Sequence, residues 1–119
     1  MNEAQLFRLV EPALPGKVFL MLAPMEAREP YVILSLVSGT PSLTLCGDAK
    51  ATQLDYQIDS YARTYGDALE VMQRIADIVD GCDGDPIIKN SQNLFEPDTR
   101  IHRVSVVVST WSQPEEVQS

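Results

Sequence analysis

The sequence has little of what marks an enzyme or a metal protein. It contains two cysteines, Cys46 and Cys82, and one histidine, His102. The cysteines form no C-x-x-C pair and stand in no secretory context, so we expect free thiols in a reducing compartment. No nucleophile motif accompanies the histidine, and the chain has neither a glycine-rich phosphate loop nor zinc-ligand spacing. The sequence therefore predicts no catalytic residue, no cofactor and no metal site.

Positive charge and long apolar runs are also scarce. Nine basic residues stand against 17 acidic ones, which gives a net charge of −8. Such a charge repels phosphate backbones and argues against nucleic acid as a tightly bound partner. No apolar run approaches the roughly 20 residues that span a bilayer, and the N-terminus carries acids where a signal peptide carries bases. We therefore expect a cytosolic origin and no membrane partner.

The chain does have enough apolar sequence for one core. Its 119 residues are 45% hydrophobic and 22% charged, as in ordinary globular proteins. A chain of this length buries about two-thirds of its unfolded surface and needs no disulfides to fold. We assign residues 1–112 to a single domain and residues 113–119, which include two glutamates, to a flexible acidic tail.

The clearest local pattern is a strand, a corner and a helix over residues 53–81. The apolar positions of the strand are Leu54, Tyr56 and Ile58. They alternate with polar residues, which predicts one buried and one wet face. Thr64 and Asp67 form a capping box, and the residues after them are apolar on one half of a helical wheel. We expect a core helix packed on a sheet, rather than a ligand-binding stripe, with Gly81 ending it in a left-handed conformation.

Weaker patterns flank this segment. The expected elements are a helix at residues 3–10, strands at 17–22, 31–38 and 101–111, and a two-residue strand at 87–88 within the irregular stretch 82–100. This order predicts a single α+β domain. Its antiparallel sheet has about four or five strands, and the N-terminal helix and the longer amphipathic helix pack on it.

The segment Gly39–Lys50 is the first candidate for an interface. Glycine and proline interrupt its apolar residues, and it is too long for a tight hairpin turn. We expect a protruding loop or β-arm. Long loops in compact domains are usually functional, so we name Thr40, Leu43 and Leu45 as candidate contacts with a neighbouring subunit or another protein.

Several segments also stand in an informative order. A helical N-terminus is followed by LPGKVFLMLAP, EPYVILSLVSGTP, YQIDSYARTYGDALEVMQRIADIVDG and FEPDTRIHRVSVVVSTW. In this order they resemble the small tail completion or tail terminator proteins of long-tailed bacteriophages and prophages. The resemblance runs over nearly the whole chain and is loosest at Cys82–Asn93.

The resemblance implies a structural role and no enzymatic activity. Proteins of this family form a ring, expected to be a hexamer, on the head-proximal end of the tail tube, stop its polymerisation and provide the surface for head-tail joining. The implied partners are further copies of the chain, the tail tube protein, a head-tail connector protein and DNA that crosses the lumen without specific binding. The implied location is the tail or neck of the virion, after assembly in the host cytoplasm. Asp55 and Asp59, on the wet strand face, are the candidates for lining the lumen.

Two alternatives stay open at this point. One is a head-tail connector or stopper protein in the adjacent ring. The other, from a different class, is a small ligand- or metal-binding module that uses the acidic turn Asp80–Asp85 and His102. The turn does not match a calcium loop, because the sixth and twelfth positions counted from Asp80 or Asp83 hold neither the required glycine nor the required acid.

Overall fold

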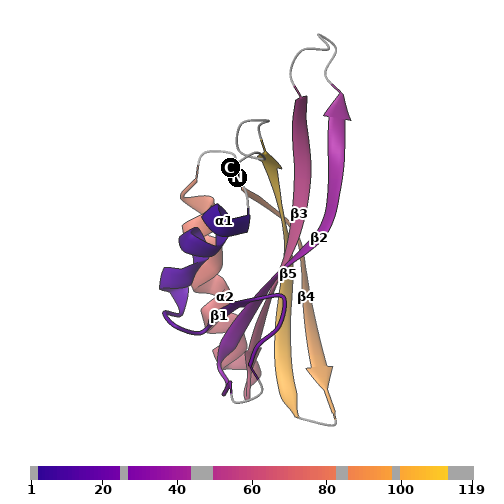
Figure 1. Ribbon diagram of the computed structural model, residues 1–119. Helices are drawn as coiled ribbons and strands as arrows, with labels where there is room; N and C mark the ends of the chain where they lie inside the picture. Colours follow the sequence, from indigo (N-terminus) through magenta and orange to yellow (C-terminus); the bar gives the residue numbers. More distant parts are fainter. Residues whose placement is uncertain (1–2, 25–26, 44–49, 83–85, 98–99, 113–119) are drawn as a thin grey trace.

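The structure is a computed structural model and describes residues 3–24, 27–43, 50–82, 86–97 and 100–112. The elements in chain order are α1 (Glu3–Val10), η1 (Glu11–Ala13), β1 (Val18–Leu20), β2 (Tyr31–Leu43), β3 (Lys50–Ala62), α2 (Tyr65–Asp80), β4 (Ile87–Glu96) and β5 (Ile101–Ser112). Figure 1 shows a long, twisted sheet with both α-helices on one of its faces. The opposite face carries no helix among the described residues, and we call it the helix-free face.

The strands form one sheet in the order β1-β2-β3-β5-β4. The α+β class, the two helices and the number of strands are as expected from the sequence. One pairing differs from the expected antiparallel sheet: β1 runs parallel to β2, with Val18 beside Val32. Because the connection after β1 returns the chain to the end of the sheet where β1 began, β2 sets out in the same direction. The other three pairings are antiparallel.

The core lies between the sheet and the apolar sides of α1 and α2. The sheet contributes Val18, Val32, Leu34, Tyr56, Ile58, Ala62, Val104, Val106 and Val108, and the helical segment contributes Leu6, Val10, Ala13, Ala68, Val71, Met72, Ile75 and Val79. In β3 and β5 the buried apolar positions are even-numbered, as the period of two requires. The expectation that α2 is a core helix is confirmed.

The start of α2 is fixed by two side-chain hydrogen bonds. Thr64 is the N-cap, and its Oγ1 accepts from the Asp67 N–H at 3.1 Å, so the capping interaction expected from the sequence is confirmed. Ser60, fully buried in β3, donates from Oγ to the carbonyl oxygen of Ala68 at 3.0 Å. This second bond ties the first turn of α2 to the sheet, eight residues back along the chain.

The expected left-handed end of α2 is wrong. Gly81 has φ −73°, which is right-handed, and its N–H donates to the carbonyl oxygens of Asp77 and Ile78. The bond to Ile78 is of the 3-10 type, which tightens the last turn and satisfies helix-end carbonyls without a left-handed residue. The glycine is therefore not required by backbone geometry at this position.

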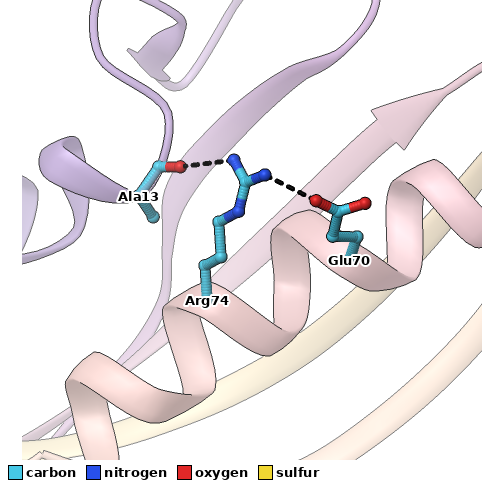
Figure 2. A network of polar contacts seen from close by, with 3 residues as sticks. All are labelled: Ala13, Glu70 and Arg74. Carbon is cyan, nitrogen blue, oxygen red and sulfur yellow. Dashed lines mark hydrogen bonds and ion pairs between the residues drawn. The ribbon is translucent and has the colours of Figure 1, made fainter.

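Arg74 connects α2 to η1. Figure 2 shows its guanidinium between two partners, with Nη2 2.6 Å from Glu70 Oε1 and Nη1 donating to the carbonyl oxygen of Ala13 at 3.4 Å. The ion pair is exposed, and an i, i+4 pair of this kind contributes only about 0.3–0.5 kcal/mol. Its main effect is to orient the arginine toward η1.

The hairpin of β2 and β3 is longer than the sequence predicts. Within the expected loop Gly39–Lys50, the strand β2 continues to Leu43, and Leu43 is paired with Lys50. The β-arm form of the expectation thus holds over these residues, and Figure 1 shows the hairpin projecting beyond the helices. Pro41 is tolerated because, among the described residues, β2 pairs at that position only with β3.

The strand β4 is the element that sequence reasoning missed. The expected strand covers two residues, whereas β4 covers ten, Ile87–Glu96, and pairs with β5 along its length. Its sequence IIKNSQNLFE shows no alternation, because at the edge of the sheet most of its side chains are exposed on both faces. Pairing with β5, rather than local propensity, makes it a strand.

Candidate functional site: the helix-free face and the edges of the sheet

The helix-free face is built mainly from polar side chains. In β3 and β5 it consists of the odd-numbered positions Gln53, Asp55, Gln57, Asp59, Tyr61, Arg103, Ser105, Val107, Ser109 and Trp111. The two strands pair so that Asp59 lies opposite Ser105 and Asp55 lies opposite Ser109. The wet strand face expected from the sequence is therefore present, and Asp55 and Asp59 both lie on it.

Asp59 is nevertheless withdrawn from solvent. Only 4% of this residue is exposed. The side-chain amide of Gln57 donates to both carboxylate oxygens, at 3.0 and 2.9 Å. Its paired neighbours are Ile33 in β2 and Ser105 in β5. A carboxylate placed in this way influences the face through its charge more than by direct contact with a partner.

The Asp55 carboxylate has a hydrogen bond from Gln53 and an ion pair with Lys89. The Gln53 amide donates to its Oδ1 at 3.3 Å and to Ser109 Oγ at 2.9 Å. The Lys89 ammonium nitrogen lies 3.8 Å from Asp55 Oδ2. The pairing register of β4 shifts between Ile88 and Asn90, so Lys89 is the extra residue of a β-bulge, a device that redirects a side chain. The charge of Asp55 is thus matched within the chain.

Beside β5 the face forms a shallow hollow of about 270 Å³. The residues that line it include the amides Gln57, Asn90 and Gln92, together with Arg103. Such a surface has hydrogen-bonding groups but few charges. Chemically it can contact polar groups of a partner or hold water.

Aromatic side chains form a row at one end of the helix-free face. The rings of Tyr31 and Tyr61 stack with their centroids 4.9 Å apart, and the Phe19 ring meets Tyr31 edge-on at 6.3 Å. Arg103 continues the row, because Nη1 donates to the Tyr61 hydroxyl at 3.4 Å and the guanidinium carbon lies 5.9 Å from the ring centroid. The row connects β1, β2, β3 and β5 at that end of the sheet.

Large apolar side chains are exposed along both outer edges of the sheet. The set at β1 and β2, which we call the β2-edge set, is Leu20, Met21, Leu22, Leu36 and Val37, and the set at β4, the β4-edge set, is Ile87, Leu94 and Phe95. Sequence reasoning did not name these residues. One signal was present: the run Tyr31–Ser38 is apolar on both faces, which a strand at the margin of a sheet leaves partly uncovered.

Two described residues of the alternative metal-binding module, Asp80 and His102, do not meet. His102 packs on Phe95, with ring centroids 4.7 Å apart, and on Tyr65, at 6.4 Å, at the start of α2. Asp80 is at the other end of this 16-residue helix, roughly 22 Å away at 1.5 Å per residue. Asp83 and Asp85 lie outside the described residues, as do Cys46 and Leu45. In the described part of the chain no three or more histidine, cysteine, aspartate or glutamate residues gather as metal ligands would.

The interface residues expected in the hairpin are only partly placed. Thr40 and Leu43 occupy paired positions of β2, opposite Gln53 and Lys50.

None of the helices within the described ranges is long and apolar enough to cross a membrane. The geometry thus offers a polar sheet face, a projecting hairpin and two apolar edges, all of them surfaces suited to assembly.

Comparison with known proteins decides the family. The family model for tail completion protein gp17 matches residues 4–113, nearly the whole chain. The chain belongs to the tail completion protein gp17 family. It is therefore a structural protein of a phage tail, as the resemblance in the sequence implied. A chain in the structure of the virion of a native gene transfer agent particle has the same fold, with a TM-score of 0.67 and 12% identity, over 92% of this chain and 90% of that one. No curated protein matches the sequence.

Proposed function

We propose that this tail completion protein assembles as a ring, expected to be hexameric, on the head-proximal end of the tail tube. There it stops the tube from growing and provides the surface to which the head joins. Membership of the family supports a place in the tail. The observation that carries the proposal is the helix-free face, a mainly polar sheet face whose aspartates are matched or hydrogen-bonded within the chain.

In this ring the helix-free face lines the lumen. Because both α-helices cover the other face, a ring with the helices outside turns amides, serines and the two aspartates toward its axis. Asp55 is paired with Lys89, and Asp59 is bonded to Gln57. With a net charge of −8, the chain repels DNA phosphates. DNA therefore passes through the lumen without specific binding.

The β2–β3 hairpin is the proposed contact with the tube or with a neighbouring subunit. It extends past the helices, so it can reach a surface that the rest of the chain does not touch (Figure 1). Thr40 and Leu43 lie on its paired part. Together with Leu45 they remain the proposed contact residues.

The test is tube growth in the presence of the protein. Purified tail tube protein is polymerised with and without this chain, and tube lengths are measured in negative-stain images. We expect shorter tubes with a ring at one end. The double variant Leu43→Asp/Leu45→Asp should lose this effect, whereas Gln73→Asp, an exposed change on α2, should retain it.

Unchanged tube lengths with wild-type protein would show that the capping role is wrong. Cross-linking to purified portal-side proteins under the same conditions then tests the alternative. Cross-links to those proteins, with none to the tube, would assign the chain to a connector or stopper ring.

A further inference from the structure

Within the described residues, the sheet has two edges that no strand covers. On one side β1 pairs only with Val32–Leu34, which leaves the outer edge of β2 open from Leu36 onward. On the other side β4, Ile87–Glu96, pairs with β5 along one edge only. An open strand edge presents backbone groups that can pair with a strand of another chain.

The way β1 ends is what opens the β2 edge. Met21 N–H still donates to the Leu34 carbonyl oxygen at 2.9 Å, but Leu22 N–H then donates back to Leu20 at 2.7 Å. This three-residue turn holds Met21 at φ +69°, a conformation that is costly for a residue with a side chain. The turn leads the chain off the sheet after three paired residues. It also leaves Leu22 with 81% of its surface exposed.

The directions of the strands suit a repeated sheet. From β2 through β3 and β5 to β4 every neighbour is antiparallel, so β4 runs in the direction of β3 and opposite to β2. In Figure 1 the arrowheads of β2 and β4 point to opposite ends of the molecule. If a second copy is related by rotation about an axis along the strands, its β4 lies antiparallel to β2 of the first. The alternation of strand directions then continues across the contact.

Both edges also carry the apolar surface that such a contact would bury. Leu36 and Val37, 46% and 55% exposed, flank the open edge of β2, and Ile87, 50% exposed, starts β4. Leu36 is level with Ile88 across the sheet, because the two are connected through the paired residues Tyr56 and Val108. The β2-edge set and the β4-edge set are on opposite sides of the sheet. A contact between unlike edges is heterologous, and a heterologous contact generates a ring when its rotation closes.

We propose that copies of this chain join head to tail by edge pairing, with the outer edge of β2 from Leu36 onward antiparallel to the start of β4 of the next copy. The pairing stops at Pro41, which has no N–H to donate. The β2-edge set of one copy packs against Ile87 of the next. The inference rests on the ring proposed above and names its subunit interface.

The apolar area shows why the occupant is a second copy in a ring. Even at the roughly 150–250 Å² that a large aromatic side chain buries, the exposed parts of these six side chains amount to only several hundred Å². A stable two-protein interface buries about 1,600 Å² in total. One edge contact is therefore too small to hold a lasting dimer. In a closed ring every copy makes two such contacts, and opening the ring breaks one without releasing a subunit.

The test is chemical cross-linking between edges. Cys46 and Cys82 are first changed to serine, and one cysteine is then placed on each edge, by Val37→Cys at the exposed bulge of β2 and by Ile87→Cys at the start of β4. The double-cysteine protein is treated with a short bismaleimide, alone at high concentration and on tail tubes. We expect a ladder of covalent oligomers that ends at the size of the ring.

Single variants determine the symmetry of the contact. Val37→Cys mixed with Ile87→Cys should give covalent dimers and nothing larger, and each single variant alone should stay monomeric. The matched control carries Ile87→Cys with Gln73→Cys, on the exposed side of α2, and should give no ladder.

Two outcomes would overturn the edge pairing. Dimers from Val37→Cys alone would show a two-fold contact between like edges. Absence of the ladder on tubes that the protein demonstrably caps would show that the ring uses other surfaces, and the proposed function would stand. Conversely, a ladder from protein that leaves tube length unchanged would keep the edge pairing and remove the capping role.

Discussion

Two leucines twelve residues apart in sequence should lose very different amounts of stability on the same substitution. Leu34 lies in β2 with none of its surface exposed, opposite Ile58 and within the core. Leu22 follows β1 with 81% of its surface exposed. Changing each to alanine removes the same atoms, so the difference between the two variants measures burial alone.

The expected magnitudes follow from burial. Leu34→Ala loses the transfer free energy of the side chain and leaves a cavity, which together cost about 3–5 kcal/mol. At about 3–6 °C per kcal/mol for a chain of this size, the melting temperature should fall by at least ~10 °C. Leu22→Ala removes a side chain of which only about a fifth is buried, worth roughly 0.3–0.6 kcal/mol. Its melting temperature should change by no more than ~3 °C.

The assay is thermal and urea unfolding followed by far-ultraviolet circular dichroism at low protein concentration. Leu34→Ala should lower the urea midpoint with an unchanged slope. Leu22→Ala should unfold like the wild type, yet give a weaker cross-linking ladder if the edge sets pack across the ring. Equal destabilisation by the two variants, or a loss below about 1 kcal/mol for Leu34→Ala, would refute the assignment of these residues to core and edge.

Three further predictions follow from single contacts. Thr64→Ala removes the hydrogen bond that caps the Asp67 N–H and should lower the free energy of unfolding by about 1 kcal/mol, while Thr64→Ser should lower it much less. Equal unfolding of the two variants would show that the cap does not contribute to stability. Burial, and to a lesser extent the charge of Glu3, raises the pKa of Tyr56 above its ordinary 10.0. The neutral hydroxyl group therefore contributes stability below pH 10. This stability is lost as the pH rises from 10 through the pKa of the folded state. Tyr56→Phe should therefore lose less stability than the wild type between pH 8 and pH 11 in urea unfolding, and parallel losses would contradict this. Asp55→Asn leaves Lys89 without its carboxylate partner on the helix-free face. Filter binding at 50 and 200 mM salt should then detect weak, salt-sensitive DNA binding that the wild type lacks. Binding by the variant as low as that of the wild type would argue against a lumen position for this face.

The candidate site was only partly predictable. The wet strand face with Asp55 and Asp59, and the interface segment after Gly39, follow from alternation and from glycine and proline placement. Burial of Asp59 does not, because it depends on the reach of Gln57 and on neighbours in β2 and β5. The apolar edges were also missed, since a run of apolar residues does not state whether a further strand covers it.

The sequence by itself determined the strand, corner and helix at residues 53–81, the cap at Thr64, the inward face of each element and the absence of a recognisable catalytic motif. These features depend on residues within a turn or two of one another, so periodicity and local hydrogen bonding reveal them. Only the tertiary structure decided that the polar segment after Ile87 is a full strand, that the hairpin continues through Pro41, and that Asp80 and His102 lie far apart. Those outcomes depend on which distant strand supplies the backbone partners, and no local pattern encodes that choice.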